Sequence, residues 1–184
     1  MRQSVVCQLD AGGYEPKTKE EIDQDWEDIA DTMTPAIASG SKEEVNGTVG
    51  FNAGGVWGYT LITTKYGDAE LFYEHGLAVT EGPVAAITKT SGLAFGLNER
   101  DATSYRGDAT SGALSVEVIP AVSGTAGGWK SDDGNAWGID AGESFGVSLP
   151  VTINGAHTNA DPSRHFTIPA PLLIVCRLLS GCGR

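Results

Sequence analysis

The alternation of apolar and polar residues along short segments is the feature that most restricts the fold of this chain. It is clearest in Ser144–Ile153, where every second residue is apolar (Phe145, Val147, Leu149, Val151 and Ile153). A period of two residues is typical of a β-strand with one buried face. Comparable segments follow one another from Val45 onward, at intervals of roughly 8–15 residues. The sequence therefore predicts an all-β protein, an antiparallel β-barrel of about eight strands, with a sandwich as the alternative.

The N-terminal part has a different pattern, which predicts one amphipathic helix over 18–34. Ile22, Trp26, Ile29 and Met33 fall on one stripe of a 3.6-residue helix, and the opposite face is strongly acidic. Thr18 with Glu21 forms a capping box, in which each side chain satisfies the other residue's free backbone N–H. We expect this helix to lie on the barrel as a lid.

One domain spanning 1–184 is the expected organisation, since this length is ordinary for a single domain. Within it, 1–44 forms an N-terminal segment that holds a short strand (Ser4–Leu9), the lid helix and a linker (Ala36–Lys42) before the strands begin at Val45. Which face of each strand points inward stays open. Trp57 and Tyr59 share one face of their strand, and Phe72 and Glu74 share one face of theirs.

Composition excludes some partners and favours a location. The net charge of −12 argues against nucleic acid and against anionic membrane surfaces, because both attract clustered Lys and Arg. No segment reaches the roughly 20 apolar residues of a membrane-spanning helix. Cys7, Cys176 and Cys182 are odd in number and show no C-x-x-C spacing. A cytoplasmic protein with free thiols and no membrane contact is the expectation.

Motif searches give no catalytic machinery. Gly142–Gly146 matches G-x-S-x-G, but Ser144 begins a strand pattern, whereas a nucleophile elbow needs a turn followed by a helix. His75, His157 and His165 lack the spacing of metal ligands. We therefore expect neither a metal nor a cofactor.

Aromatic residues in the predicted strands are the candidate binding residues. An eight-stranded barrel is just wide enough to be filled by side chains or to hold one small ligand, and aromatic walls with a few polar groups are typical of ligand pockets. An ordinary core of aromatic residues is the alternative, and a Glu74 that faces solvent is the alternative to a buried one. The candidate substrate-binding residues are Trp26, Trp57, Tyr59, Phe72, Glu74, Trp137 and Phe145.

An acidic amphipathic helix over 18–33, followed by a Gly-rich antiparallel barrel of this size, resembles the small β-barrel cyclases of spirotetramate and spirotetronate biosynthesis. The resemblance concerns layout and carries over no catalytic residue. It implies a cofactor-independent [4+2] cyclase (a Diels-Alderase) that folds a linear polyketide in a hydrophobic pocket. Such catalysis rests on holding the reacting groups in a near-attack geometry and on excluding water.

Two other functions remain open: a non-catalytic barrel that binds a hydrophobic ligand, and a structural protein such as a viral decoration protein. An empty apolar cavity favours the cyclase or the ligand-binding barrel. A filled interior with large exposed apolar patches favours the structural protein. The expected partner is a hydrophobic small molecule, and a homodimer is also compatible with the sequence.

Overall fold

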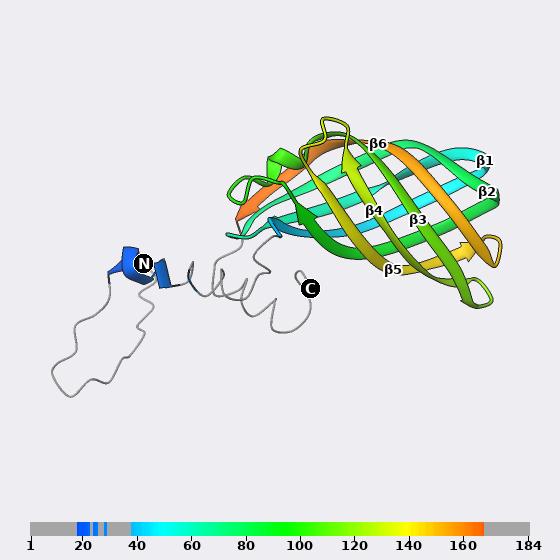
Figure 1. Cartoon of the computed structure of the whole chain (residues 1–184), viewed down its shortest axis with the longest axis horizontal. Helices are drawn as coiled ribbons and strands as arrows, with labels where there is room; N and C mark the ends of the chain where they lie inside the picture. The colour runs from blue at the N-terminus through cyan, green and yellow to red at the C-terminus, as the bar shows by residue number, and fades with distance from the viewer. Residues whose placement is uncertain (1–17, 23, 26–27, 29–37, 168–184) are drawn as a thin grey trace.

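The computed structural model describes residues 18–22, 24, 25, 28 and 38–167 of the chain. The described body contains six strands and one 3₁₀ helix (Figure 1). The strands are β1 (Gly40–Thr64), β2 (Asp68–Phe95), β3 (Gly107–Ile119), β4 (Val122–Ser131), β5 (Trp137–Val147) and β6 (Val151–Thr167). The 3₁₀ helix η1 (Ala102–Tyr105) lies between β2 and β3.

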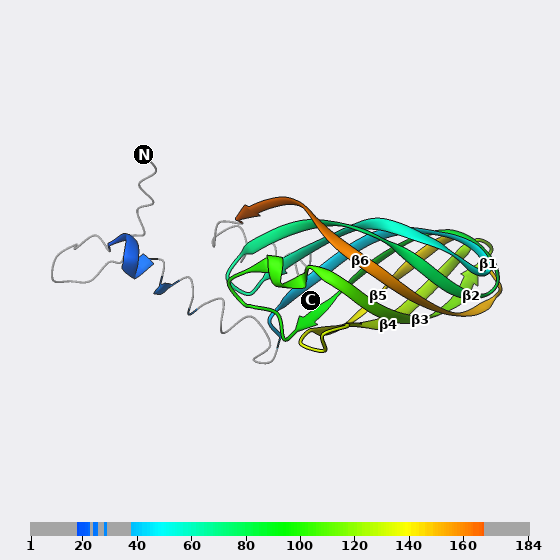
Figure 2. The same cartoon turned by 90° about the horizontal axis from the view of Figure 1, so that it is seen from above.

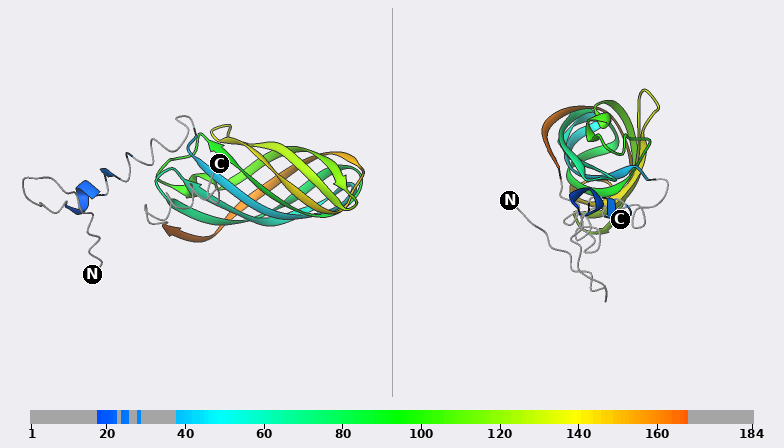
Figure 3. Two further views of the ribbon diagram at one scale, coloured as in Figure 1. Left: turned by 90° about the horizontal axis from the view of Figure 1, so that it is seen from below. Right: turned by 90° about the vertical axis from the view of Figure 1, so that its left-hand side faces the viewer.

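The strands form a closed antiparallel barrel. Their order is β1-β2-β5-β4-β3-β6, and a further pairing between β2 and β6 closes the ring. β2 can reach two neighbours because its Asp68–Thr80 part pairs with β6 while its Ala85–Phe95 part pairs with β5. Figure 2 shows the strands crossing the long axis obliquely, and the right view of Figure 3 looks along that axis. The all-β antiparallel barrel predicted from the sequence is confirmed.

β1 reverses direction within its own length. The reversal lies at Phe51–Ala53, where the register to β2 shifts and Asn52 adopts φ 61°. Beyond it the two arms lie side by side: a Cβ added to Gly54 would approach the Cα of Gly50 to 2.6 Å. Such an approach leaves no room for a side chain, so glycine is required there.

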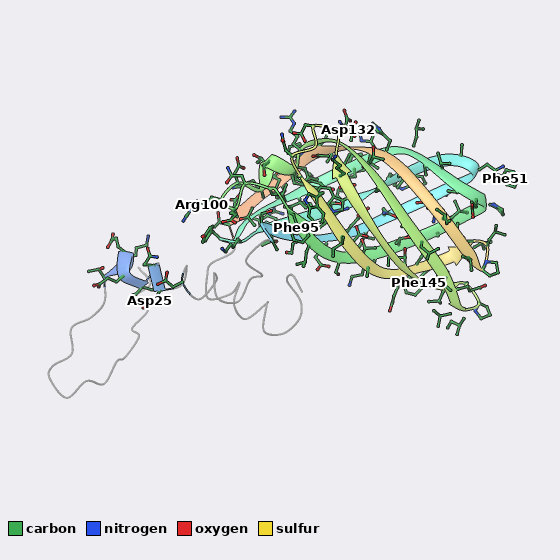
Figure 4. All side chains as sticks on the ribbon, in the orientation of Figure 1. Asp25, Phe51, Phe95, Arg100, Asp132 and Phe145 are labelled. Carbon is green, nitrogen blue, oxygen red and sulfur yellow. The ribbon has the colours of Figure 1, made fainter. Side chains whose placement is uncertain are left out.

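β2 reverses as well, at Thr80–Pro83. Gly82 has φ 78°, and its N–H donates a 3.0 Å hydrogen bond to Asn52 Oδ1, which ties the two reversals together. One arm of β1 pairs with each arm of β2. The arms of β1 and β2 therefore run along the barrel and back, and Figure 4 labels Phe51 at one end of the barrel and Phe95 at the other.

The barrel has two ends with different connections. The turn end carries tight connections at Phe51–Ala53, Thr80–Pro83, Ile119–Val122 and Val147–Val151. The open end carries the turn after Thr64, the Ser131–Trp137 turn and the longer connection that contains η1. We call the part of the barrel next to each end the turn half and the open half.

An apolar core fills the inside of the open half. Tyr105 is carried inward by η1, whose N-cap Asp101 accepts a hydrogen bond from Thr103 N–H. The Tyr105 ring meets Phe72 and Trp129 edge-on, with centroid distances of 5.1 and 5.0 Å. The buried cluster consists of Ile62, Phe72, Ala94, Leu97, Ala102, Tyr105, Trp129, Ala136 and Ala160.

The turn half has the opposite arrangement. Its inward side chains are mostly hydroxyls and amides, such as the buried Ser115, Thr125 and Thr152. Its outward side chains form what we call the apolar belt, all of them large, apolar and more than 40% exposed: Val45, Val49, Phe51, Trp57, Leu77, Val79, Ile87, Leu114, Val116, Val118, Ile119, Phe145, Val147, Leu149, Val151 and Ile153. Trp57 and Phe145 belong to this outer surface.

Two boundaries and the helix need comment. β1 begins at Gly40 and not at Val45, so the end of the expected linker belongs to the barrel wall. The described helical residues start at Lys19, directly after Thr18, and the predicted capping box is present: Thr18 N–H donates to Glu21 Oε2 (2.8 Å) and Glu21 N–H to Thr18 Oγ1 (3.2 Å). The full 18–34 helix, its role as a lid and the Ser4–Leu9 strand fall wholly or partly outside the described residues.

Candidate functional site

A cluster of charged side chains occupies the barrel interior where the two halves meet. Lys42 and Glu44 project inward from β1, and Lys42 Nζ lies 2.5 Å from Glu44 Oε2 and 3.9 Å from Asp140 Oδ2 of β5. Asn46 Nδ2 donates to the other Glu44 oxygen at 2.5 Å. Lys42 Nζ also lies 5.5 Å from the Trp129 ring centroid, where the π face favours a cation.

The electrostatics of this cluster fix its protonation states. Burial alone lowers the pKa of Lys42, but the carboxylates around it outweigh burial and hold that pKa well above its usual value. Burial raises the pKa of Glu44, yet Lys42 outweighs it and the pKa falls below its usual value. Lys42 and Glu44 therefore form a charged pair at neutral pH.

Asp140 and Tyr105 complete the cluster, and the pKa of each is raised, which favours its protonated form. Burial raises the pKa of Asp140 against the pull of Lys42, and Glu44 adds to the rise. Burial also raises the pKa of Tyr105 well above its usual value, and its hydroxyl donates a 2.6 Å hydrogen bond to Glu74 Oε1. Neither a protonated Lys42 nor a protonated Tyr105 is a nucleophile, so the cluster favours structural work over covalent catalysis.

The interior cavity beside this cluster is small and polar. Its volume is about 100 Å³, and its wall includes Lys42, Asp140, Thr90 and Asn154. Thr90 Oγ1 and Asn154 Oδ1 are buried without a hydrogen-bond partner among the described residues. A polar cavity of this size holds a few water molecules, whereas pockets for drug-sized ligands have about 300–1,000 Å³.

The residues predicted to bind substrate separate into two groups. Phe72 and Glu74 point into the barrel and are buried, at 0% and 6% exposure. Trp57, Tyr59, Trp137 and Phe145 point outward and are about half exposed, so the expected aromatic lining of an enclosed pocket does not form. Trp26 lies outside the described residues. Strand alternation places these four aromatic residues on the outer surface once the inward face of each strand is known.

Ser144 has the ordinary strand environment expected for it. It lies inside β5, where its Oγ is 3.0 Å from Thr88 Oγ1 across the β2–β5 ladder. No group of three or more His, Cys, Asp or Glu residues that could hold a metal is found within the described part of the chain.

Sequence reasoning missed the charged cluster. Lys42 falls in the expected linker, and Glu44 directly precedes the strand that the sequence predicts to begin at Val45. The signal was present, however: Lys42, Glu44 and Asn46 alternate with Glu43, Val45 and Gly47, so a strand begun at Gly40 places all three polar side chains on one face.

A groove on the outer wall of the turn half is larger than the interior cavity. It has a volume of about 540 Å³. Trp57, Tyr59 and Tyr73 stand on one side and Val45, Val49, Ile87 and Phe145 on the other, over Gly47, Gly58, Ala85 and Ala86. Tyr59 and Tyr73 contact each other with ring centroids 5.5 Å apart.

Comparison with known proteins leaves the fold and the site as the basis for inference. No family model, curated protein or solved structure matches the chain. The described helical residues include no helix long and apolar enough to cross a membrane. What the molecule defines is a class: a small closed antiparallel barrel with a polar, ion-paired interior and an apolar outer belt.

Proposed function

We propose that this protein is a membrane-inserted β-barrel whose turn half lies in the lipid bilayer while its open half stays in water. One observation carries the proposal: in the turn half, polarity is inverted relative to a water-soluble protein. Barrels that live in lipid alternate apolar outward residues with polar inward residues along every strand. A lipid environment favours outward apolar and inward polar side chains, because acyl chains contact apolar groups favourably and cannot hydrate charged ones.

The size and continuity of the belt separate it from ordinary surface apolar residues. Single exposed apolar residues are normal on soluble proteins, but contiguous patches above a few hundred Å² mark interaction surfaces. Belt residues come from β1, β2, β3, β5 and β6, and the outward β4 positions in this half are Val122, Gly124, Ala126 and Gly128. The belt thus runs over five of the six described strands, and the outward β4 positions that lie between them carry no charge.

On β3 and β6 the length of the uncharged outer surface also fits a bilayer, whereas on β2 and β5 the uncharged surface ends at Lys89 and Glu143. Outward positions of β3 from Thr110 to Val118 carry no charge, and those of β6 from Val151 to Asn159 include only His157 as a titratable group. A transmembrane β-strand needs about 9–11 residues at a tilt near 45°. Trp57, Tyr59 and Tyr73 lie toward the open-half side of the belt, where aromatic residues commonly mark the membrane–water interface.

The number of strands also fits the smallest membrane barrels if the two arms of each reversed strand are counted separately. Each of β1 and β2 supplies two arms, and β3 to β6 supply one each, so we propose that the six strands act as a wall of eight arms. Eight strands enclose an interior that side chains fill. The buried Lys42–Glu44 pair and the core around Tyr105 are such a filling.

This proposal departs from the expectation of a cytoplasmic protein without membrane contact. That expectation rested on net charge and on the lack of a long apolar segment, and neither quantity registers apolar residues at alternate positions. A [4+2] cyclase stays a prediction without support from the interior, because a polar cavity of about 100 Å³ cannot enclose a linear polyketide. A structural role that covers the belt with protein is the competing interpretation.

Liposome flotation tests the proposal. The full chain, refolded in the presence of phosphatidylcholine vesicles, should rise with the vesicles in a density gradient and stay bound after washes with high salt and alkaline carbonate. Protein that stays in the dense fractions as a monodisperse oligomer would instead assign the belt to protein–protein contacts.

A further inference from the structure

The outer groove of the turn half has a charged row at its open-half edge. Val45, at the groove wall, is the register partner of Lys89, and Lys89 is the register partner of Glu143. One step toward the turn end, Gly47, Ile87 and Phe145 are partners in the same way and line the groove. Lys89 and Glu143 therefore lie next to the groove on the same outer face.

The groove itself is suited to a flexible apolar chain. Its floor is formed by outward positions with little or no side chain, Gly47 and Ala85, and the Trp57 ring lies 3.4 Å from the Cβ position of Gly47. Its walls are aromatic and aliphatic, and their exposure of 39–60% leaves them uncovered by the described chain. The volume of about 540 Å³ is in the range of pockets that bind small molecules.

The charged residues at the open-half edge of the groove indicate which polar headgroup a ligand would carry. Lys89 and Glu143 present one positive and one negative group side by side, beside an otherwise apolar surface. A phosphate carries the charge that Lys89 attracts, and an ammonium or trimethylammonium group carries the charge that Glu143 attracts. Both groups occur together in the headgroup of a zwitterionic phospholipid.

We propose that the groove binds one zwitterionic phospholipid, with an acyl chain along the floor at Gly47 and Ala85, the phosphate at Lys89 and the amine at Glu143. This assignment rests on the proposed function, and it agrees with the orientation given there. The head lies toward the open half in water, and the chain points toward the turn half in the bilayer.

Native mass spectrometry of the full chain in non-ionic detergent tests this site, with added phosphatidylethanolamine, phosphatidylglycerol or palmitate as probes. The wild type should retain one phosphatidylethanolamine at collision energies that strip the other two. Ala85→Trp fills the groove from its floor and should lower the retained fraction about tenfold, the effect of a change near 1.4 kcal/mol. Ala126→Trp, the same change at an exposed outward site on β4, should leave retention unaltered.

Further variants keep the test decisive. Ala85→Leu fills less of the groove and should give intermediate retention, with circular dichroism to verify the barrel. Lys89→Ser combined with Glu143→Ser should remove the preference for phosphatidylethanolamine over phosphatidylglycerol. Equal retention by wild type and Ala85→Trp, or equal retention of all three probes by wild type, overturns the site. Flotation of Ala85→Trp with vesicles separates that outcome from failure of the membrane proposal, because the belt remains intact in this variant.

Discussion

The open half and the turn half of the same barrel obey opposite rules of polarity. In the open half, Phe72, Tyr105 and Trp129 pack inside, and the outside mixes charged residues such as Asp108 and Asp161 with exposed apolar residues, among them Trp137 and Ile139. In the turn half, the inside holds hydroxyls and amides, and the outside holds the apolar belt. A continuous wall thus serves two solvents, because the backbone of a closed barrel is hydrogen-bonded whatever surrounds it.

The charged cluster lies where the two arrangements meet. Lys42 reaches the Trp129 ring on the open-half side and the polar cavity on the other. An ion pair at this level is costly unless it is well paired, because each buried charge loses its hydration. The cluster therefore separates the apolar core of the open half from the polar interior of the turn half.

The largest expected effect comes from charging the belt. Val116→Arg places a cation on the outward face of β3 in the turn half, and an arginine at the bilayer midplane costs about 2–4 kcal/mol. We expect this variant to lose most of its flotation with vesicles. Thr110→Arg, outward on the same strand at the open-half edge of its uncharged stretch, is the control and should float like wild type, because an arginine near the interface costs only about 0–1 kcal/mol. Equal behaviour of the two variants would erase the distinction between the halves.

The second-largest effect should come from truncating the apolar core of the open half. Trp129→Ala deletes a ring that is 5% exposed and contacts Tyr105, and such truncations cost about 3–5 kcal/mol. Thr125→Ala, inward on the same strand but in the polar interior of the turn half, should lower the free energy of unfolding far less. Chemical denaturation of the detergent-folded protein compares the two. Equal losses would show that the turn-half interior is as tightly packed as the open half.

Breaking the central ion pair should cost slightly less and should depend on pH. Glu44→Gln leaves Lys42 without its closest counter-ion, and removing one partner of a buried pair costs about 3 kcal/mol or more. Because the folded pKa of Glu44 is lowered, its stabilisation is present above its unfolded pKa and is lost as the pH falls through the folded value. The gap between wild type and Glu44→Gln should therefore close in acid, as thermal melting at a series of pH values can establish.

The smallest effect should have the opposite sign. The folded pKa of Asp140 is raised, so its ionised form opposes folding, and stability decreases as the pH rises from its unfolded value through its folded one. Asp140→Asn should therefore melt at a slightly higher temperature than wild type at pH near 7, and the difference should vanish below about pH 4. A lower melting temperature at neutral pH would assign Asp140 to the stabilising partners of Lys42.

The two halves also explain which parts of this molecule the sequence predicts. Alternation over Ser144–Ile153 identifies strands and the barrel class, because it depends only on the two-residue period. It does not say which alternate set faces inward, and the usual assumption puts the apolar set inside. That assumption holds for Phe72 and is wrong for Trp57, Tyr59, Trp137 and Phe145.

Other features of the barrel depend on contacts between distant residues. Strand closure needs β2 to pair with both β5 and β6, and the cluster needs Asp140 to meet Lys42 across the β2 strand. Neither pairing is encoded in local spacing. Local signals were more informative at Thr18 and Glu21, whose capping box involves residues three apart.

The accessibility of nitroxide spin labels in vesicles tests the central claim most directly. Labels would be placed at outward β3 positions 110, 114, 116 and 118, in a chain whose Cys7, Cys176 and Cys182 are replaced by serine. Collision with oxygen, which concentrates in lipid, should be highest at positions 114 and 116 and lower at positions 110 and 118, and collision with a water-soluble nickel complex should show the reverse order. Equal exposure of all four labels to the nickel complex would contradict a turn half that lies in the bilayer.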